Sequence, residues 1–322
     1  MLAVYCETQS ADDPLSCLQV GERPEPEPRD GWSVVTLKAA TLNHHDLFSL
    51  KGVGLPADRL PMTLGCDGAG IDEDGNEVIL HCVVASPGWT GDETLDPQRS
   101  LLSEVHQGTF SEKVLVPTAN LVPKPADMSW ETAAALPTAW LTAYRMLFTN
   151  GNVTPGSLVL VQGAGGGVAT ALIQLGAAAG LRVWVTSRDP EKNERALELG
   201  AEAAFESGAR LPEKVDSVME SVGAATWSHS VNVLRPGGSI VICGATSGDA
   251  PKKAELTKIF FRQLRVIGST MGNRFELDRL AKFVQTQGIE PVIDSTHALA
   301  DAHTAFERLH SGESFGKIVL TA

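Results

Sequence analysis

Residues 158–169 read Leu-Val-Leu-Val-Gln-Gly-Ala-Gly-Gly-Gly-Val-Ala, a continuous apolar run followed at once by a glycine-rich loop. Such a run is typical of a parallel strand buried on both faces, and the mostly apolar residues 168–179 predict a helix. A tight turn that needs small residues for packing would give a similar loop. The strand before it and the helix after it favour nucleotide binding, because they are the context that this motif requires.

The loop fits the pattern A-x-G-x-x-A when it is read from Ala164. In that register Gly166 lets the backbone approach a pyrophosphate, and Ala169 is small enough for the helix to pack on the strand. The phosphates would then lie at the helix N-terminus, where N–H groups and the helix dipole favour anions. The residues expected to hold them are Gly163, Ala164, Gly165, Gly166, Gly167 and Val168.

Strands and helices alternate after this loop, which is the pattern of a doubly wound parallel sheet of the Rossmann type. The apolar runs and turn residues predict further strands at 182–186, 203–205, 215–220 and 239–243, and helices at 190–199 and 225–234. We therefore expect an α/β nucleotide-binding domain built around residues 158–169.

The end of the strand at 182–186 distinguishes NADP from NAD. NAD-binding domains carry an acid here for the ribose 2′-hydroxyl, whereas this chain continues with Ser187 and Arg188. A hydroxyl and a guanidinium suit the dianionic 2′-phosphate of NADPH. Asp189 would be the acid if the register slipped, and Arg188 as an ordinary surface residue is a second alternative.

The chain on either side of this region has a different pattern of predicted strands, loops and helices. Before it, short strands are predicted at 34–37, 77–80 and 109–116, with a surface loop at 86–107 and a helix at 133–148 that Ser129 or Asp127 could cap. After it, helices are predicted at 277–287 and 298–309 and a strand at 317–320. With 322 residues, two domains are expected. We place them at 1–125, 126–264 and 265–322, the last segment returning to the first domain.

Composition limits the possible partners. The net charge of -13 disfavours binding to nucleic acid or to an anionic membrane surface. The five cysteines are scattered and form no CxxC pair, so a disulfide framework is not indicated. No signal peptide or membrane-spanning run is visible. We expect a soluble, cytoplasmic protein that acts on a small molecule.

A series of short motifs occurs in order along nearly the whole chain. They are LNHHDL at 42–47, LGCDGAG at 64–70, GTFSE at 108–112, ALPTAWLTAY at 135–144, LGA at 199–201, LRPGG at 234–238 and GKIVL at 316–320. With the glycine loop, this ordered set resembles the medium-chain dehydrogenase/reductase superfamily. The resemblance implies a GroES-like β-barrel domain before and after the Rossmann domain. It also implies a homodimer, with residues 265–268 as the edge strand of the dimer.

Zinc alcohol dehydrogenases of this family carry a Cys, then a His beside a Glu, then a Cys or an acid. The matching positions here are Asn43, Cys66 with Asp67, and Thr138. Asn and Thr are poor ligands for zinc, which prefers nitrogen, sulfur and carboxylate donors. Residues 83–107 also lack the four cysteines of the structural zinc lobe. We therefore expect no metal, as in the quinone oxidoreductase-like branch.

In that branch, hydride passes from NADPH to a quinone or to the β-carbon of an activated alkene. By resemblance, the hydrogen-bond donors that face the nicotinamide cleft are Asn43, His44, His45 and Thr138. Asn43 is expected to orient the substrate or the carboxamide, and His45 to protonate an enolate. The alternatives are a turn-capping Asn43 and a structural His45. Further cofactor contacts implied by the resemblance are His44, Thr142, Lys192, Gly244 and Lys317.

Two other functions remain open at this point. A zinc-type alcohol dehydrogenase would need ligands besides Cys66 and Asp67, and metal analysis would reveal it. A regulatory protein could bind NADPH and turn nothing over, which a screen of NADPH oxidation would reveal.

Overall fold

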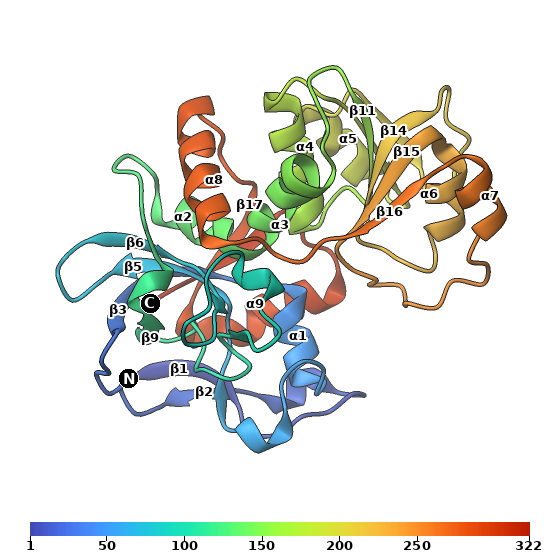
Figure 1. Cartoon of the computed structure of the whole chain (residues 1–322). Helices are drawn as coiled ribbons and strands as arrows, with labels where there is room; N and C mark the ends of the chain where they lie inside the picture. The colour runs from blue at the N-terminus through green and yellow to red at the C-terminus, as the bar shows by residue number, and fades with distance from the viewer. The chain divides into compact units, whose positions relative to one another are not determined.

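The computed structural model describes residues 1–322 and contains two compact units, drawn in Figure 1. Unit 1 comprises Met1–Ala139 and Gly272–Ala322, and unit 2 comprises Trp140–Met271. Each unit has its own sheets and its own hydrophobic core.

Unit 2 contains a six-stranded parallel sheet in the order β13-β12-β11-β14-β15-β16. This is the strand order of dinucleotide-binding domains, in which the first and fourth strands, here β11 and β14, lie at the centre. It confirms the predicted doubly wound sheet. The strands are β11 (Leu158–Gln162), β12 (Arg182–Ser187), β13 (Ala203–Glu206), β14 (Val215–Glu220), β15 (Leu234–Ile242) and β16 (Arg265–Gly268).

Helices connect these strands, as is usual for parallel pairs, except that residues 207–214 join β13 to β14 without a helix. The helices are α4 (Gly167–Ala178), α5 (Pro190–Glu198), α6 (Trp227–Val233) and α7 (Leu256–Phe261), preceded by the short α3 (Leu141–Tyr144). The helix predicted at 133–148 is instead irregular: an α-helical turn at α2 (Trp130–Ala135) passes into π-helical turns at Leu136–Trp140 and Arg145–Asn150. Ser129 caps α2 as predicted, since its side chain accepts a hydrogen bond from the N–H of Thr132.

Unit 1 is built mainly of antiparallel strands. Its main sheet has the order β10-β6-β5-β3-β18-β17, and β9 pairs with the first half of β3, on the edge opposite β5. Smaller sheets contain β2-β1-β4 and β7-β8. The strands are β1 (Leu2–Cys6), β2 (Leu18–Glu22), β3 (Trp32–Thr41), β4 (Met62–Thr63), β5 (Asp67–Ile71), β6 (Glu77–Leu80), β7 (Val83–Val84), β8 (Ser100–Leu101), β9 (Lys113–Pro117), β10 (Leu121–Pro123), β17 (Ile293–Ala298) and β18 (Lys317–Thr321).

The last strand of the chain lies inside the main sheet of unit 1. β18 pairs antiparallel with β3 and parallel with β17. Residues from both ends of the chain therefore meet in one sheet, which matches the GroES-like domain implied by the sequence motifs.

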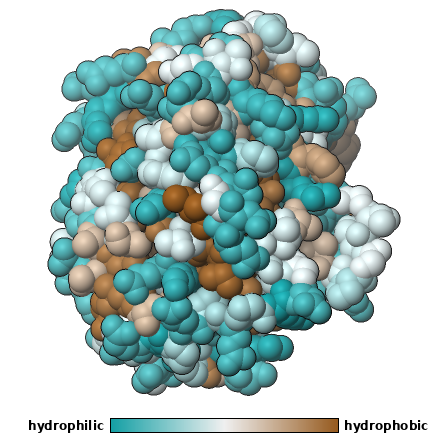
Figure 2. Space-filling model, turned by 90° about the vertical axis from the view of Figure 1, so that its left-hand side faces the viewer, coloured by the Kyte–Doolittle hydropathy of each residue, from teal (hydrophilic) through white to brown (hydrophobic).

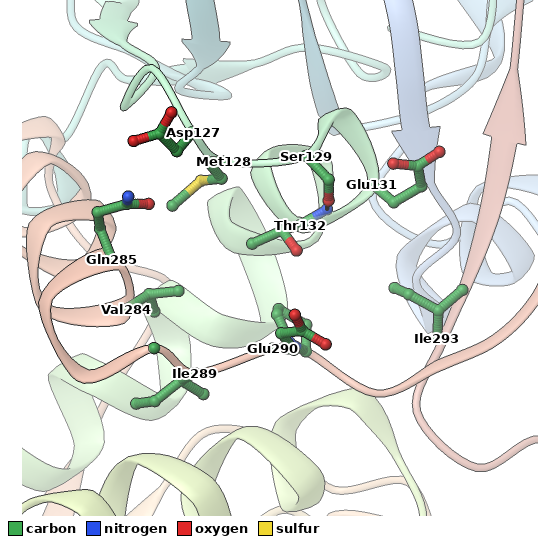
Figure 3. Close-up of a pocket in the computed structure, with 12 residues that line it drawn as sticks. Asp127, Met128, Ser129, Glu131, Thr132, Val284, Gln285, Ile289, Glu290 and Ile293 are labelled. Atoms are coloured by element: carbon green, nitrogen blue, oxygen red, sulfur yellow. Dashed lines mark hydrogen bonds between the residues drawn. The ribbon is translucent and has the colours of Figure 1, made fainter.

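The helices of unit 1 are α1 (His44–Leu50), α2, α8 (Arg274–Gln287) and α9 (Ala302–Ser311). A capping box formed by Asn273 and Glu276 begins α8, and Gly288 in the left-handed region ends it. Figure 3 shows a cavity of about 410 Å³ lined by the start of α2 and the end of α8. Its acidic lining residues are Asp127, Glu131 and Glu290.

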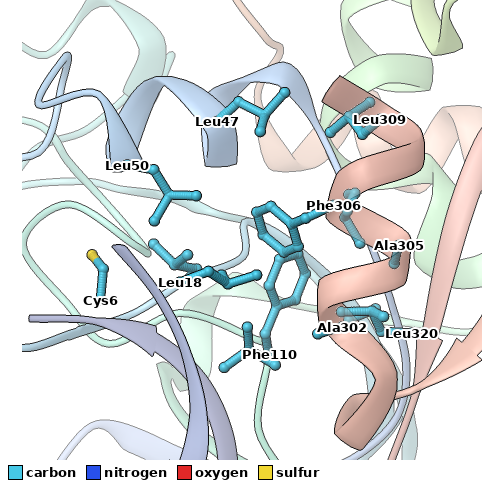
Figure 4. Close-up of a cluster of buried hydrophobic side chains, with 14 of the residues drawn as sticks. Cys6, Leu18, Leu47, Leu50, Phe110, Ala302, Ala305, Phe306, Leu309 and Leu320 are labelled. Atoms are coloured by element: carbon cyan, nitrogen blue, oxygen red, sulfur yellow. The ribbon is translucent and has the colours of Figure 1, made fainter. Parts of the chain in front are cut away.

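The core of unit 1 lies between α1, α9 and the strands (Figure 4). Leu47 and Leu50 of α1 are buried in this core together with Phe306 and Leu309 of α9. The rings of Phe110 and Phe306 meet edge to face with centroids 6.1 Å apart, a favoured geometry for aromatic pairs. This packing holds α1 firmly against the unit.

The unit boundaries differ from the positions expected from the sequence. The first lies after Ala139 rather than after residue 125, because α2 packs on β3 and β5 of unit 1. The second lies after Met271 rather than after residue 264, because β16 completes the parallel sheet of unit 2. The pattern of predicted strands and helices indicates where the fold changes along the chain. It does not indicate which of the two units each connecting segment packs against.

The face in Figure 2 is largely hydrophilic, with hydrophobic residues in separate groups. None of the helices has the length and apolar character required to cross a membrane.

Candidate active site

Helix α1 positions the histidines of the LNHHDL motif. Asn43 precedes the helix in extended conformation, and its N–H donates to Oδ2 of Asp46 at 2.8 Å, as in a capping box. Leu47 and Leu50 are buried in the core. On this helix His44 is exposed and His45 is half-buried.

A buried ion pair fixes the side chain of Asn43. Nζ of Lys317 lies 3.0 Å from Oδ2 of Asp67 and donates to Oδ1 of Asn43 and to the carbonyl of Leu42, both at 2.7 Å. Nδ2 of Asn43 donates to the same Asp67 oxygen at 2.8 Å, as does the hydroxyl of Thr41 at 2.7 Å. The second N–H of the amide has only a long 3.5 Å contact with the carbonyl of Thr41.

This network changes the role expected for Lys317. The sequence motifs implied a cofactor contact, but the ammonium is buried and its three hydrogens are taken by Leu42, Asn43 and Asp67. Lys317 therefore has no donor left for a ligand in this arrangement. Its position indicates that it neutralises Asp67 and orients the amide of Asn43.

His45 lies between a carboxylate and a thiol. Its Nε2 is 2.8 Å from Oε1 of Glu104, and its Nδ1 is 3.4 Å from Sγ of Cys66. Burial lowers the pKa of His45, but the hydrogen bond to Glu104 and the nearby carboxylates outweigh it and raise the pKa above its ordinary value. The ring is thus well suited to hold a proton.

The two groups beside His45 have pKa values raised by their surroundings. Burial raises the pKa of Asp46 to about 6, against the opposing effects of His45 and the N–H of Asn43. A hydrogen bond with Cys82, followed by burial, raises the pKa of the Cys66 thiol well above its ordinary value. Cys66 is therefore a thiol rather than a reactive thiolate at neutral pH.

Thr138 lies in the same unit, in the π-helical segment after α2, and is half-buried. Its hydroxyl is 3.9 Å from the sulfur of Cys82, and the thiol of Cys82 in turn contacts Cys66. The three predicted catalytic residues Asn43, His45 and Thr138 are thus all connected, directly or through one neighbour, to the Cys66–Asp67 dipeptide.

In unit 2, the glycine loop follows β11 and leads into α4, as predicted. Gly163 has φ +93°, a left-handed conformation that favours glycine. Gly166 is the exposed N-cap of α4, and a Cβ placed on it would meet no atom within 4 Å. Ala169 is buried within α4. The open backbone at Gly166 and the N–H groups of the first turn fit a phosphate.

A buried polar network, which local sequence did not reveal, secures the strands under this loop. Gln162 accepts from the hydroxyl of Thr186 at 2.6 Å and donates to Ser230 at 2.9 Å, and Ser230 donates to Glu220 at 2.6 Å. Because these residues come from β11, β12, α6 and β14, the network links the carboxyl ends of three parallel strands. Ligands of doubly wound sheets bind at this edge.

The residues after β12 differ in the interactions that they make. Asp189 caps α5, since its carboxylate accepts from the N–H groups of Glu191 and Lys192 at 3.0 and 3.5 Å. Arg188 is exposed and makes no hydrogen bond or ion pair, and Ser187 is half-buried beside it. The acid that could have bound a ribose 2′-hydroxyl is therefore engaged in a helix cap, and the guanidinium is available to an anion.

The other cofactor candidates of unit 2 are dispersed. Gly244 lines a cavity of about 300 Å³ with Glu220 and Trp227 at the carboxyl ends of β14 and β15. Thr142 is buried on α3, and Lys192 lies in the first turn of α5. None of the candidates in either unit lines the cavity of Figure 3, so that cavity is separate from the groups described here.

Glu104 is the residue that sequence reasoning missed. It lies in the segment 86–107, which was expected to be a surface loop, and no periodicity or motif marks it. Only the fold reveals that this segment returns to His45, whose ring lies 59 positions earlier in the chain. A charged residue inside a loop is common, so the sequence offers no signal that would separate Glu104 from its neighbours.

Comparison with known families supports this architecture. Residues 29–126 match the family described as alcohol dehydrogenase GroES-like domain, and residues 167–307 match the family described as zinc-binding dehydrogenase. The second description raises the question of whether zinc fits the family's ligand positions in this chain.

The residues at those positions do not fit zinc. Asn43 is held by hydrogen bonds to Asp67 and Lys317, and the ammonium of Lys317 already places a positive charge 3.0 Å from Asp67. A dication on the same carboxylate would be repelled. Thr138 supplies only a neutral hydroxyl, which is a weak ligand for zinc.

Relatives match the chain over nearly its whole length. The zinc-type alcohol dehydrogenase-like protein YogA of Leptosphaeria maculans is 30% identical over 94% of this chain and 93% of its own. A crotonyl-CoA reductase of Streptomyces collinus is 27% identical over 95% and 82%. The crystal structure of an NAD-dependent alcohol dehydrogenase superposes with a TM-score of 0.90 at 32% identity, covering 100% of both chains. The chain belongs to the medium-chain dehydrogenase/reductase superfamily and is an oxidoreductase.

Proposed function

We propose that the chain is an NADPH-dependent reductase of α,β-unsaturated carbonyl compounds or quinones that needs no metal for catalysis. The observation that carries this proposal is the ammonium of Lys317, which lies between Asn43 and Asp67. It supplies positive charge at the family's zinc-ligand positions and fixes an amide there. The relative named crotonyl-CoA reductase supports a conjugated acceptor.

The residues of unit 2 fit NADPH. The backbone at Gly166 is open enough for the pyrophosphate to approach it. The guanidinium of Arg188 has no partner within the protein and would bind the 2′-phosphate. Asp189 is occupied by the cap of α5, which argues against NAD. The nicotinamide ring of the bound cofactor supplies hydride.

Polar side chains of unit 1 would stabilise the negative charge that forms on the acceptor and then neutralise it with a proton. When hydride reaches a conjugated carbon, negative charge spreads onto the carbonyl oxygen, where a hydrogen-bond donor stabilises it. The second N–H of the Asn43 amide, which has only the 3.5 Å contact with Thr41, is such a donor. His45, held by Glu104, would deliver the proton that completes the reduced product. Thr138 would be an additional donor.

A ketone without conjugation is a poorer substrate for this set of residues. Its reduction concentrates charge on an alkoxide, which a zinc ion or a strong acid normally stabilises. A conjugated acceptor delocalises the same charge, so that one amide and one imidazole suffice. This difference predicts the substrate preference.

The test is a screen of NADPH oxidation against a short enal, an enoyl thioester, a quinone, an aldehyde and a simple ketone. We expect turnover with the conjugated acceptors, and full activity after treatment with a chelator. Rapid oxidation of simple alcohols with NAD, abolished by the chelator, would instead indicate an alcohol dehydrogenase, as the name of the 32% identical structure suggests. Binding of NADPH without any turnover would indicate a regulatory protein.

We also propose a homodimer formed through β16. This strand is at the edge of the parallel sheet, and exposed sheet edges readily pair with another strand. Val266 of β16 is exposed, and α7 nearby in sequence exposes Leu256, Phe260 and Phe261. An isologous pairing of two such edges would cover these apolar side chains.

A further inference from the structure

Three side chains of unit 1 present metal-binding atoms to one another. The ligand atoms of His45, Asp46 and Cys66 all lie within 4.8 Å of one another. They supply an imidazole nitrogen, a carboxylate oxygen and a sulfur, the donor types of protein zinc sites. Two of them, His45 and Asp46, are not at the family's ligand positions.

His45 is oriented as a metal-binding histidine would be. Its Nε2 is held by the carboxylate of Glu104 at 2.8 Å, and its Nδ1 is 3.4 Å from Sγ of Cys66. A carboxylate on one ring nitrogen commonly fixes the ring so that the other nitrogen binds the metal. For zinc–nitrogen and zinc–sulfur bonds of about 2.0 and 2.3 Å at tetrahedral angles, the two ligand atoms lie roughly 3.5 Å apart.

The carboxylate of Asp46 provides the second, independent observation. The side chain is fully buried, and Oδ2 accepts the N–H of Asn43, but Oδ1 has no hydrogen-bond partner. A buried carboxylate oxygen without a partner is costly. A cation bound by His45 and Cys66 would satisfy it, since Asp46 belongs to the same cluster.

We propose that His45, Asp46 and Cys66 form a site for a soft divalent cation such as Zn²⁺, with Glu104 as the residue that positions His45. On binding, Cys66 gives up its proton to solvent and coordinates as thiolate. Three protein ligands leave the fourth tetrahedral position to water. Asp67 stays outside the set because Lys317 neutralises it.

Occupation of this site inhibits the reductase. A cation on Nδ1 removes His45 from proton delivery and places a fixed charge near Asn43, whose backbone N–H donates to Asp46 in the capping box. This consequence rests on the proposed function, whereas the metal site itself does not. Binding and inhibition are therefore measured separately.

The binding experiment uses Co²⁺ as a spectroscopic probe of the full-length protein after treatment with a chelator. We expect one equivalent to bind with a thiolate-to-cobalt charge-transfer band, and Zn²⁺ to displace it. Cys66→Ser should abolish the band, His45→Ala should weaken binding at least tenfold, and Glu104→Gln should weaken it about 10–100-fold. Cys243→Ser, which removes a thiol of unit 2, is the matched control and should bind like the wild type. Circular dichroism checks that each variant is folded.

Two outcomes would overturn the site. One is the absence of a charge-transfer band in the wild type at saturating Co²⁺, and the other is an unchanged band in both Cys66→Ser and His45→Ala. Inhibition is then tested with Zn²⁺ and an active acceptor, and Cys66→Ser should relieve it. If no acceptor is turned over, the proposed function fails while the cobalt result still decides the site.

Discussion

The ammonium of Lys317 lies 3.0 Å from a carboxylate oxygen of Asp67, and both side chains are almost completely buried. The two residues are 250 positions apart in the chain, so β18 must be docked on the sheet before the pair can form. Removing one partner of such a pair leaves a buried charge without compensation, which is far more costly than losing an exposed ion pair.

Lys317→Met should therefore lower the free energy of unfolding by about 3–5 kcal/mol. The double variant Lys317→Met/Asp67→Asn should recover much of this loss, because neither charge then remains. Urea denaturation of the single and double variants measures both effects. Lys282→Met, which breaks an exposed pair with Asp278, is the control and should be almost neutral. Equal stability of Lys317→Met and wild type would contradict the role given to the pair.

Arg188 should determine the preference for NADPH. Arg188→Ala should weaken NADPH binding by about 1.5–3 kcal/mol, the scale of a charge-assisted hydrogen bond, and should leave NADH binding unchanged. Fluorescence titration with both cofactors makes the comparison, and Arg210→Ala, an exposed arginine of the same unit, serves as control. A wild-type preference for NADH would show that the strand-end argument fails.

Asn43 should matter more than His45 for turnover. Asn43→Ala should lower kcat/KM by roughly 10–1000-fold, the range between a lost orienting contact and a lost transition-state donor, with little change in NADPH affinity. His45→Ala should have a smaller effect, because water can also protonate the product. Steady-state kinetics on a quinone and a short enal measure both. Asn76→Ala, in a surface turn with Asp72, should behave as wild type; a wild-type rate for Asn43→Ala would exclude its proposed role.

The protonation of Asp294 should make the free energy of unfolding depend on pH in the acidic range. Burial alone would raise the pKa of Asp294, but Arg308 and the N–H of Phe315 outweigh it and lower the pKa. A carboxyl with a lowered pKa in the folded state stabilises the fold above its unfolded pKa of about 3.9 and loses this effect as the pH falls through the folded pKa. The difference in free energy of unfolding between wild type and Asp294→Asn should thus be largest near neutral pH. It should shrink below pH of about 4; a constant difference would contradict the linkage.

If the chain forms a dimer through β16, a charged substitution in this strand should lower the mass of the protein in solution. Val266→Asp places a charge on the edge strand β16 and should convert a dimer into monomers, because like charges would face one another across the pairing. Light scattering after size exclusion determines the mass. Leu197→Asp, at another exposed apolar position of unit 2, should leave it unchanged. A monomeric wild type would exclude the proposal.

The sequence predicted unit 2 well because local patterns there specify the elements. The apolar run ending at Val161, the glycines after it and the apolar residues 168–179 predict β11, the loop and α4 within one residue of the observed bounds. In unit 1 short strands pair over long separations, so β3 and β18 are recognised individually but their contact is not. The Lys317–Asp67 pair and the return of Glu104 to His45 depend on such contacts. These two contacts define the geometry of the candidate site, and local sequence patterns carry no information about such long-range contacts.

The location of β18 also determines when the protein can mature during synthesis. Unit 2 is a continuous segment, whereas unit 1 is completed only when β18, which follows unit 2 in the sequence, joins β3 and β17. Until β18 has been synthesised and has joined the sheet, the end of β3 lacks one neighbouring strand and Asp67 has no cation beside it. A nascent chain could therefore complete its nucleotide-binding unit and still lack an ordered Asn43. The proposed catalytic residues would become ordered only after β18 has joined unit 1, so the docking of this strand controls when the chain becomes active.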